Sequence, residues 1–306
     1  MPVKIPDGLP ARQILEQEGV LVIPQSRAFV QDIRPLRVAI VNLMPLKSVT
    51  ETQLLRLLSG SPLQVSPTFL ALSSRQSKNT PPEHLAKFYK SFAEVRQERF
   101  DCLIVTGAPV ETLPFTEVAY WDKLRELLDW SLSHVYSSLH LCWGAQAALH
   151  HYYGIEKHLL PRKLSGIFAH MVAKERSALL QGFDRKFFAP HSRYTEVRRE
   201  DILKVSPLCL LAESPTAGVY LAARRDGRQV FVTGHPEYDK LTLREEYERD
   251  VANRVPVSLP VHYFPGNNPR KMPVVSWRGH AHLLFTNWLN DVYQHAPFDL
   301  NELKPP

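Results

Sequence analysis

Short apolar runs alternate with amphipathic stretches through the first half of the chain. Three runs predict buried strands: RVAIVNLMP (37–45), PTFLALSS (67–74) and DCLIVTGAP (101–109). Apolar residues recur at helical spacing in two stretches, TETQLLRLLSG (50–60) and WDKLRELLDWSLS (121–133). VYSSLHLCWGAQAALHHYYG (135–154) has the pattern of a strand, a sharp turn and a helix. Strands that alternate with helices in this way predict an α/β fold built on a doubly wound, mostly parallel sheet.

The pattern in the second half is less regular. Shorter strands are predicted near 166–173, 208–213, 219–223 and 228–239, and helices over 243–253 and 277–294. The five prolines of 255–273 indicate a structured loop and not a linker, because flexible Gly/Ser tracts are absent. We therefore expect a single α/β domain over 35–306, preceded by an N-terminal arm (1–34) that packs on the domain or on a dimer partner.

The composition is that of a globular protein, with 44% hydrophobic and 22% charged residues. Those values exclude a disordered, collagen-like or coiled-coil chain. No apolar run reaches the roughly 18 residues that span a bilayer, and the N-terminus lacks the apolar core of a secretory signal. Three cysteines are too few for a disulfide framework and suit a reducing compartment. We expect a soluble cytoplasmic protein without membrane contact.

The net charge of +6 comes from 37 basic and 31 acidic residues that are scattered along the chain. Without a basic run or a zinc-finger spacing, nucleic acid is not expected as a partner. An anionic small molecule such as a nucleotide or coenzyme A suits the charge better. The thirteen histidines do not predict a metal site, because no carboxylate or cysteine cluster accompanies them at ligand spacing.

The sharpest local signal is LHLCWGAQAALHH around Cys142. A cysteine at a strand-to-helix turn stands at the end of the sheet, where open α/β folds bind their ligands. The N-terminus of the following helix favours the thiolate, and the backbone N–H of Trp143 is placed to donate to an oxyanion. The alternative is a small buried hydrophobe, an interpretation that suits Cys102 and Cys209 within their apolar runs.

A nucleophilic cysteine needs a base that a third group holds in place. GHPEYD offers both, because His235 follows the strand QVFVTG and alternating chain direction puts Glu237 on the same side. The tripeptide alone is a weak signal that an ordinary exposed loop would also show. The order, an elbow cysteine followed by His-x-Glu at the end of another strand, favours the triad Cys142–His235–Glu237.

This constellation resembles the class I glutamine amidotransferase-like superfamily, which has a flavodoxin-like sheet, an elbow that reads Cys-x-Gly-x-Gln and a His-Pro-Glu that completes the triad. Within it, the chain is more similar to the homoserine O-acyltransferases, also called homoserine transsuccinylases. The similar stretches run in order from about residue 28 to 300 and include RPLRVAIVNLMPLK, DCLIVTGAPVE, CWGAQAAL, GFDRKFFAPHSRYTEV, VTGHPEYD and LLFTNWLN. WRGHAHLLF departs from the family's Trp-Arg-Ser-His-Gly-Asn stretch, which leaves the triad intact.

The resemblance implies a ping-pong acyl transfer in methionine biosynthesis, with no bound cofactor. Cys142 would attack the thioester of an acyl-CoA co-substrate, acetyl-CoA or succinyl-CoA, and release coenzyme A. His235 would then take the γ-hydroxyl proton of L-homoserine while Glu237 orients the imidazole. The family also implies a homodimer.

Family positions outside the triad supply further candidate residues. The backbone N–H of Lys47 in MPLK would pair with that of Trp143 as an oxyanion hole. Arg249 in YERD would bind the substrate carboxylate, since a guanidinium can hold a carboxylate with two hydrogen bonds. The other family substrate positions match Lys163 in PRKLSG and Ser192 in APHSRY.

Specificity for the acyl group is expected to depend on Glu111 in TGAPVETLPF, which follows the third strand at the ligand edge of the sheet. In the resembling family an acidic residue here accompanies acetyl donors, and glycine accompanies succinyl donors. Repulsion between Glu111 and the distal carboxylate of a succinyl group agrees with that correlation, so acetyl-CoA is the expected donor. Arg193, next to Ser192, is either a rim residue or a further specificity residue.

Other activities remain open at this point. Succinyl-CoA is the alternative donor, and L-serine is an alternative acceptor that is one methylene shorter. A glutamine amidotransferase would use the same triad on glutamine but would need a synthase partner or domain. A ligand-binding protein with a relic triad would not trap an acyl group on Cys142.

Overall fold

The computed structural model describes residues 3–17, 22–25, 34–72, 79–173 and 177–305. Within these ranges twelve strands form one sheet in the order β2-β1-β4-β3-β6-β7-β12-β11-β10-β8-β9, with β5 paired to β4. The strands are β1 (Val3–Ile5), β2 (Val22–Pro24), β3 (Leu36–Val41), β4 (Val65–Ala71), β5 (Tyr89–Ser91), β6 (Phe100–Val105), β7 (Val135–Leu141), β8 (His158–Val172), β9 (Lys186–Glu196), β10 (Leu208–Ser214), β11 (Gly218–Arg224) and β12 (Gln229–Val232). The helices are α1 (Ala11–Gln17), α3 (Lys47–Leu58), α4 (Pro82–Phe88), α5 (Phe92–Val95), α6 (Trp121–His134), α7 (Trp143–Tyr153), α8 (Arg199–Leu203), α9 (Thr242–Ala252) and α10 (Arg278–His295).

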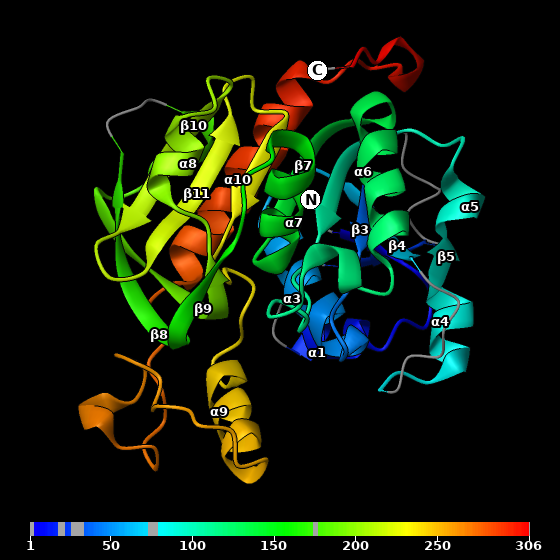
Figure 1. Cartoon of the computed structure of the whole chain (residues 1–306). Helices are drawn as coiled ribbons and strands as arrows, with labels where there is room; N and C mark the ends of the chain where they lie inside the picture. The colour runs from blue at the N-terminus through cyan, green and yellow to red at the C-terminus, as the bar shows by residue number, and fades with distance from the viewer. Residues whose placement is uncertain (1–2, 18–21, 26–33, 73–78, 174–176, 306) are drawn as a thin grey trace.

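The sheet has two halves that differ in strand direction. All strand pairs from β2 and β5 through β12 are parallel, and all pairs from β12 through β11, β10 and β8 to β9 are antiparallel. In Figure 1 the antiparallel half lies on the left, and α9 projects below the β8–β9 hairpin. The expected α/β class with a mostly parallel, doubly wound sheet is confirmed.

The central parallel strands are buried on both faces. In β3, Val38 and Ile40 pack into a core with the apolar residues of α3 and α10, whereas Ala39 and Val41 pack into a second core with those of α6 and α7. Figure 1 shows α7 in front of the sheet and α10 behind it. This two-sided burial explains why these strands read as nearly continuous apolar runs and not as alternating ones.

The described part of the N-terminal segment packs on the domain. β1 pairs with both β2 and β4, and Ile5, Leu9 and Leu15 belong to the same core as α3 and α10. The first three predicted strands and the helices α3, α6, α7, α9 and α10 form at the expected places. No helix in the described ranges combines the length and apolarity that crossing a bilayer requires.

The less regular second half departs from expectation in one respect. The strand predicted near 166–173 is the end of β8, which is 15 residues long, and the pattern does not predict β9 at all. These two strands pair antiparallel at the outer end of the sheet. They are important for the site described next, because both contribute residues to its cavity.

Candidate active site

The carboxyl ends of four parallel strands meet at one edge of the sheet. Val41 of β3 is the register partner of Val105 of β6, and Leu141 of β7 is the partner of Val232 of β12. The loops that follow these strands therefore converge. One of them, residues 109–114 after β6, is called the acyl loop below.

Cys142 lies at this edge, on a strained turn between β7 and α7. Its φ of 48° and ψ of −115° are unfavourable for a residue with a side chain, as expected of a nucleophile elbow. A Cβ on Gly144 would lie 2.6 Å from the carbonyl oxygen of Thr106 and 2.8 Å from that of Val105, so only glycine lets the helix start this close to β6. The sulfur thus stands at the N-terminus of an 11-residue helix, which favours negative charge there.

His235 and Glu237 complete the predicted arrangement in space. Cys142 N–H donates to the carbonyl oxygen of Val232 at 2.7 Å, which ties the elbow to the strand that leads to His235. His235 Nδ1 lies 2.7 Å from Glu237 Oε1, and a Cβ on Gly107 would lie 3.2 Å from Cys142 Cβ and 3.7 Å from His235 Cε1, so the Cys142 and His235 side chains are neighbours. All three side chains are buried. The expectation that His235 and Glu237 lie on the same side of the chain is confirmed by this contact.

The triad forms a coupled set of charges. Burial alone would lower the pKa of His235, but the Cys142 thiolate and the Glu237 carboxylate outweigh burial and raise it well above the usual 6.5. The raised pKa favours the protonated, positively charged form of His235 beside the Cys142 side chain.

Cys142 and His235 open onto a cavity of about 230 Å³. Its lining comes from the loop after β3, the acyl loop, the elbow, strands β8 and β9, the His235 loop and α9. The lining residues are Met44, Pro45, Ala108, Pro109, Glu111, Thr112, Cys142, Lys163, Ser192, Tyr194, His235, Tyr238, Glu246, Arg249, Asp250 and Val255. Six of the ten residues predicted for the site line this one cavity: Cys142, His235, Glu111, Lys163, Ser192 and Arg249.

Two cations and two carboxylates in the cavity lining contact one another. Lys163 Nζ lies 2.7 Å from Asp250 Oδ2 and 3.6 Å from Glu246 Oε2. Arg249 donates through Nε and Nη2 to Asp250 Oδ1 at 3.0 and 2.8 Å, and the Ser192 hydroxyl donates to Glu246 at 2.5 Å. We call Lys163, Glu246, Arg249 and Asp250 the charged cluster. Its two positive and two negative groups suit a ligand that carries both charges.

Tyr238 connects the charged cluster with the triad. Its ring stacks on His235 with centroids 4.0 Å apart and 21° between the planes, and its hydroxyl donates to Glu246 Oε1 at 2.6 Å. Burial and the Glu246 carboxylate raise the pKa of Tyr238, so the hydroxyl stays protonated and can donate. The ring therefore restricts the orientation of the imidazole from the side of the cavity.

The acyl loop contributes Glu111 to the lining of the same cavity. Burial raises the pKa of Glu111, and a hydrogen bond from the backbone N–H of Tyr194 opposes that shift, as do the charges of His235 and Lys163. Glu111 and Cys142 therefore line one cavity.

The remaining predicted residues lie outside the cavity lining. Lys47 is the first residue of α3, and its ammonium donates to the carbonyl oxygens of Asn42 and Met44; burial lowers its pKa to about 8. Trp143 is the first residue of α7 and is fully buried. The oxyanion-hole role of their backbone N–H groups stays a prediction.

The interpretation of Arg193 as a rim residue is wrong. Its side chain is 1% exposed, and the guanidinium donates to the carbonyl oxygens of Thr195 and Ala217 and to His191 Nδ1. A rim residue would face solvent, whereas this one is enclosed by the protein. The other interpretation of Arg193, as a specificity residue, stays a prediction.

Sequence reasoning missed Glu246, Asp250, Tyr238 and Tyr194. Glu246 and Asp250 are the first and last residues of EYERD on α9. Glu246 is three positions before Arg249 and four before Asp250, so these charges lie close together on the helix. Tyr238 directly follows the triad glutamate, so its place beside His235 was open to inference. Tyr194 is on the unpredicted strand β9.

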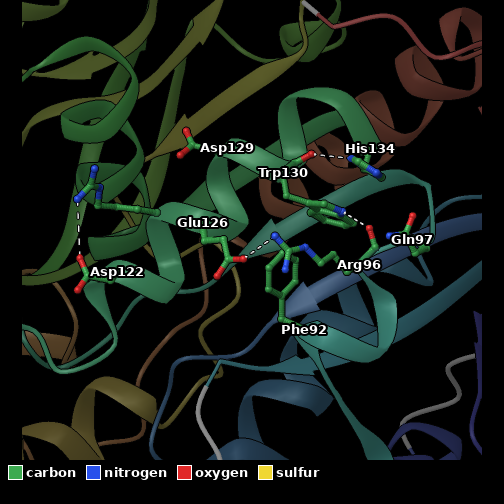
Figure 2. A pocket seen from close by; sticks show the side chains of 9 residues that line it. Phe92, Arg96, Gln97, Asp122, Glu126, Asp129, Trp130 and His134 are labelled. Atoms are coloured by element: carbon green, nitrogen blue, oxygen red, sulfur yellow. Dashed lines mark hydrogen bonds and ion pairs between the residues drawn. The ribbon is translucent and has the colours of Figure 1, made fainter.

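A larger depression lies elsewhere, between α6 and the segment 92–97, with a volume of about 630 Å³. Figure 2 shows an ion pair in its lining, between Arg96 and Glu126 at 3.0 Å. Trp130 Nε1 donates to the carbonyl oxygen of Arg96 at 2.8 Å. None of the predicted site residues lines it, so the smaller cavity at Cys142 is the candidate active site.

Comparison with known proteins decides the family. The family model described as homoserine O-succinyltransferase matches residues 2–298. The chain belongs to the homoserine O-succinyltransferase family. It is therefore an acyltransferase, and the resemblance seen in the sequence is confirmed. Two similar proteins are named homoserine O-acetyltransferase. The one from Acetivibrio thermocellus is 59% identical over 305 residues, which cover 99% of this chain and 100% of that protein. The one from Brevibacillus brevis is 57% identical with the same coverage.

Solved structures show the same fold at low sequence identity. A glutamine amidotransferase from Methylobacillus flagellatus superposes with a TM-score of 0.54 at 13% identity, covering 90% of this chain and 97% of that one. Another, from Thermotoga maritima, gives 0.50 at 11% identity, covering 86% and 98%. The class I glutamine amidotransferase-like fold expected of this homoserine O-succinyltransferase family member is confirmed.

Proposed function

We propose that the protein transfers an acetyl group from acetyl-CoA to the γ-hydroxyl of L-homoserine through an acyl-thioester on Cys142. The observation that carries this proposal is the single cavity that is lined by Cys142, by the charged cluster and by Glu111. A nucleophile, a site for a zwitterionic amino acid and a group that selects the acyl chain are thus within reach of one another. The names of the relatives, homoserine O-acetyltransferase, support both substrates.

The first half-reaction uses the His235 imidazolium and the Cys142 thiolate. The sulfur attacks the carbonyl carbon of the acetyl thioester, and the resulting oxyanion accepts hydrogen bonds from the backbone N–H of Trp143 and, we propose, of Lys47. The carbon–sulfur bond to coenzyme A then breaks, and the departing thiolate takes the proton from His235. Cys142 is left as an acetyl-thioester and His235 as a neutral imidazole.

The second half-reaction reverses these roles. Neutral His235 removes the γ-hydroxyl proton of homoserine as the oxygen attacks the acetyl carbon. Collapse of the tetrahedral intermediate breaks the bond to the Cys142 sulfur, which leaves as a thiolate beside the newly formed imidazolium. Glu237, 2.7 Å from Nδ1, keeps Nε2 directed at the reacting atoms and stabilises the positive ring.

The charged cluster supplies what a zwitterionic acceptor needs. Lys163 and Arg249 would hold the substrate carboxylate, and Glu246 would accept a hydrogen bond from its ammonium group. These groups neutralise one another in the free protein, since Asp250 bridges both cations. A bound amino acid would exchange these internal ion pairs for equivalent ones with the substrate, so the buried charges are never left without partners.

The proposal is tested by steady-state kinetics of the full chain with acetyl-CoA or succinyl-CoA as donor and homoserine as acceptor. We expect transfer with the higher kcat/KM for acetyl-CoA, and intact mass spectrometry without acceptor should show one acetyl group on the protein. L-serine and glutamine serve as competing substrates. Ammonia release from glutamine without acyl transfer would show that the proposal is wrong, and a higher kcat/KM for succinyl-CoA would overturn the donor alone.

A further inference from the structure

Lys157 lies between α7 and β8, beyond the end of the helix that follows Cys142. Its ammonium donates to the carbonyl oxygens of Glu111 and Leu113, both at 2.5 Å. Lys157 therefore binds the backbone of the acyl loop. The same nitrogen lies 4.5 Å from the centre of the Phe115 ring, within cation–π distance. Lys157 is not among the residues that line the cavity.

The acyl loop is also held at two other points. On the cavity side, the Glu111 carboxylate accepts a hydrogen bond from the backbone N–H of Tyr194. At the end of the loop, Phe115 stacks on His150 of α7 with centroids 4.5 Å apart and on Trp121 at 5.1 Å. Of the three attachments, only the one made by Lys157 acts on the backbone of the residue that carries the specificity carboxylate.

The Lys157 ammonium is partly withdrawn from water and therefore depends on its two carbonyl acceptors. Burial lowers the pKa of Lys157, and the nearby carboxylates of Glu111 and Glu156 partly oppose that shift. A partly buried ammonium is stable only when its N–H groups find acceptors, and here two acceptors are main-chain carbonyl groups of one short loop. Removing the ammonium would leave both carbonyl groups without this donor and would free the loop to move.

We propose that Lys157 is a positioning residue for donor selectivity: by clamping the carbonyl groups of Glu111 and Leu113, it keeps the Glu111 carboxylate at the place where the acyl chain on Cys142 ends. This inference rests on the proposed function, since it deepens the role given there to Glu111. Repulsion between two carboxylates falls as their distance grows, whereas an acetyl group has no charge to repel. Releasing the loop should therefore relax the exclusion of succinyl more than it affects the use of acetyl.

The test compares kcat/KM for acetyl-CoA and succinyl-CoA in a double-mutant cycle of Lys157→Met and Glu111→Gly. Methionine keeps the apolar stem of lysine and removes the charge and the donors. In Lys157→Met we expect the acetyl-over-succinyl ratio to fall roughly tenfold, a change that a few ångströms of carboxylate retreat can supply. In Glu111→Gly, adding Lys157→Met should leave the ratio unchanged within about twofold, because a clamp that acts through Glu111 has nothing left to position.

Two further variants separate positioning from general effects. Lys204→Met removes an ammonium that is 73% exposed, pairs with Asp201 at 2.9 Å and lies outside the cavity, so it should leave the ratio unchanged. Lys157→Arg keeps the charge and the N–H donors and should retain most of the selectivity. If Lys157→Met does not fold, Lys157→Gln, which keeps an N–H donor without the charge, replaces it and should lower the ratio by a smaller factor.

Several outcomes would overturn the inference. An unchanged ratio in Lys157→Met would do so, as would an equal loss with both donors, which would mean a contact with the coenzyme A portion or a purely structural role. The same fall of the ratio in the Glu111→Gly background would also contradict it.

Hydrogen exchange of the peptide that contains residues 109–115 tests the clamp independently of activity. Faster exchange in Lys157→Met supports the clamp on the loop, and unchanged exchange contradicts it. A wild type that transferred no acyl group would refute the proposed function and with it the selectivity role, whereas the exchange result would still show whether Lys157 holds the loop.

Discussion

The two halves of the sheet contribute different things to the one cavity. The parallel half supplies Cys142 and His235, the two groups that we propose to react, from turns directly after β7 and β12. The antiparallel half supplies Lys163 and Ser192 from the middle of β8 and β9, and α9 adds the other charges. His235 is 3% exposed, whereas the side chain of Arg249 is 58% exposed.

This difference indicates that the proposed reacting groups are held more rigidly than the proposed binding groups. The reacting atoms are held by backbone hydrogen bonds between parallel strands, such as the 2.7 Å bond from Cys142 N–H to Val232, and by close packing at Gly144. Such preorganisation lowers the barrier of a chemical step. The binding groups are at the ends of long side chains whose charges balance one another, so they can re-pair when a substrate enters. Assays of the two half-reactions should therefore respond differently to substitutions in the two halves of the sheet.

Cys142→Ser should have the largest effect, because it removes the group on which both half-reactions depend. A hydroxyl has a far higher pKa than a thiol and would remain protonated beside His235, so we expect acyl transfer to fall by at least ~10³-fold. Thermal unfolding should be little changed, since the two side chains are similar in size. Cys209→Ser is the matched control: this cysteine is also buried, but it lies in β10 and its thiol contacts the carbonyl oxygen of Ala223. Turnover by Cys142→Ser close to the wild-type rate would refute the acyl-thioester.

Lys163→Met should harm only the second half-reaction. It removes one cation of the charged cluster and leaves Asp250 paired with Arg249 alone. A lost charged hydrogen bond costs about 1.5–3 kcal/mol, so kcat/KM for homoserine should fall roughly 10–100-fold. The burst of coenzyme A released before acceptor is added should keep its wild-type rate. A parallel loss in the burst would mean that the antiparallel half also takes part in the first step.

The two halves also differ in how much of their structure the sequence predicted. The triad was recognisable because each member lies within a short motif at a strand end, where the period of the backbone fixes which side chains face one another. Strand β9 was not recognisable, because KFFAPHSRYTE carries Pro190 and mixes polar with apolar residues. It is the outermost strand of the sheet, where a proline and a polar face are tolerated.

Contacts that join distant segments were beyond the sequence pattern. Glu246 meets Ser192 across 54 positions and Lys163 meets Asp250 across 87, and nothing local in either segment specifies the other. Lys157 is 46 positions from Glu111, and its motif YGIEKHLL shows only an ordinary polar residue. Only the assembled sheet brings these groups together.

Glu111→Gly should shift the donor preference toward succinyl-CoA. Two like charges ~4 Å apart at an effective dielectric of about 20 repel by roughly 4 kcal/mol, and half of that already corresponds to more than tenfold. We therefore expect the acetyl-over-succinyl ratio of kcat/KM to fall by at least about tenfold, because glycine removes both charge and bulk. Glu111→Gln, which keeps the bulk without the charge, should fall between the wild type and Glu111→Gly. A ratio that is the same in all three proteins would show that selectivity has another source.

The smallest expected effect is a pH dependence of that same ratio. Burial raises the pKa of Glu111 above its usual 4.5, so this carboxylate begins to take up its proton at a higher pH than an exposed glutamate does. The repulsive charge is fully present above that raised pKa and is lost as the pH falls through it. The acetyl-over-succinyl ratio should consequently be constant near neutral pH and decline a few-fold on acidification, well before an exposed glutamate would titrate. Protonation changes at His235 affect both donors alike and cancel in the ratio. The distal carboxylate of succinyl-CoA titrates too, but it does so in every variant, so Glu111→Gln measures its share. If Glu111→Gln showed the same decline at the same pH as the wild type, the titrating group would belong to the substrate and not to Glu111.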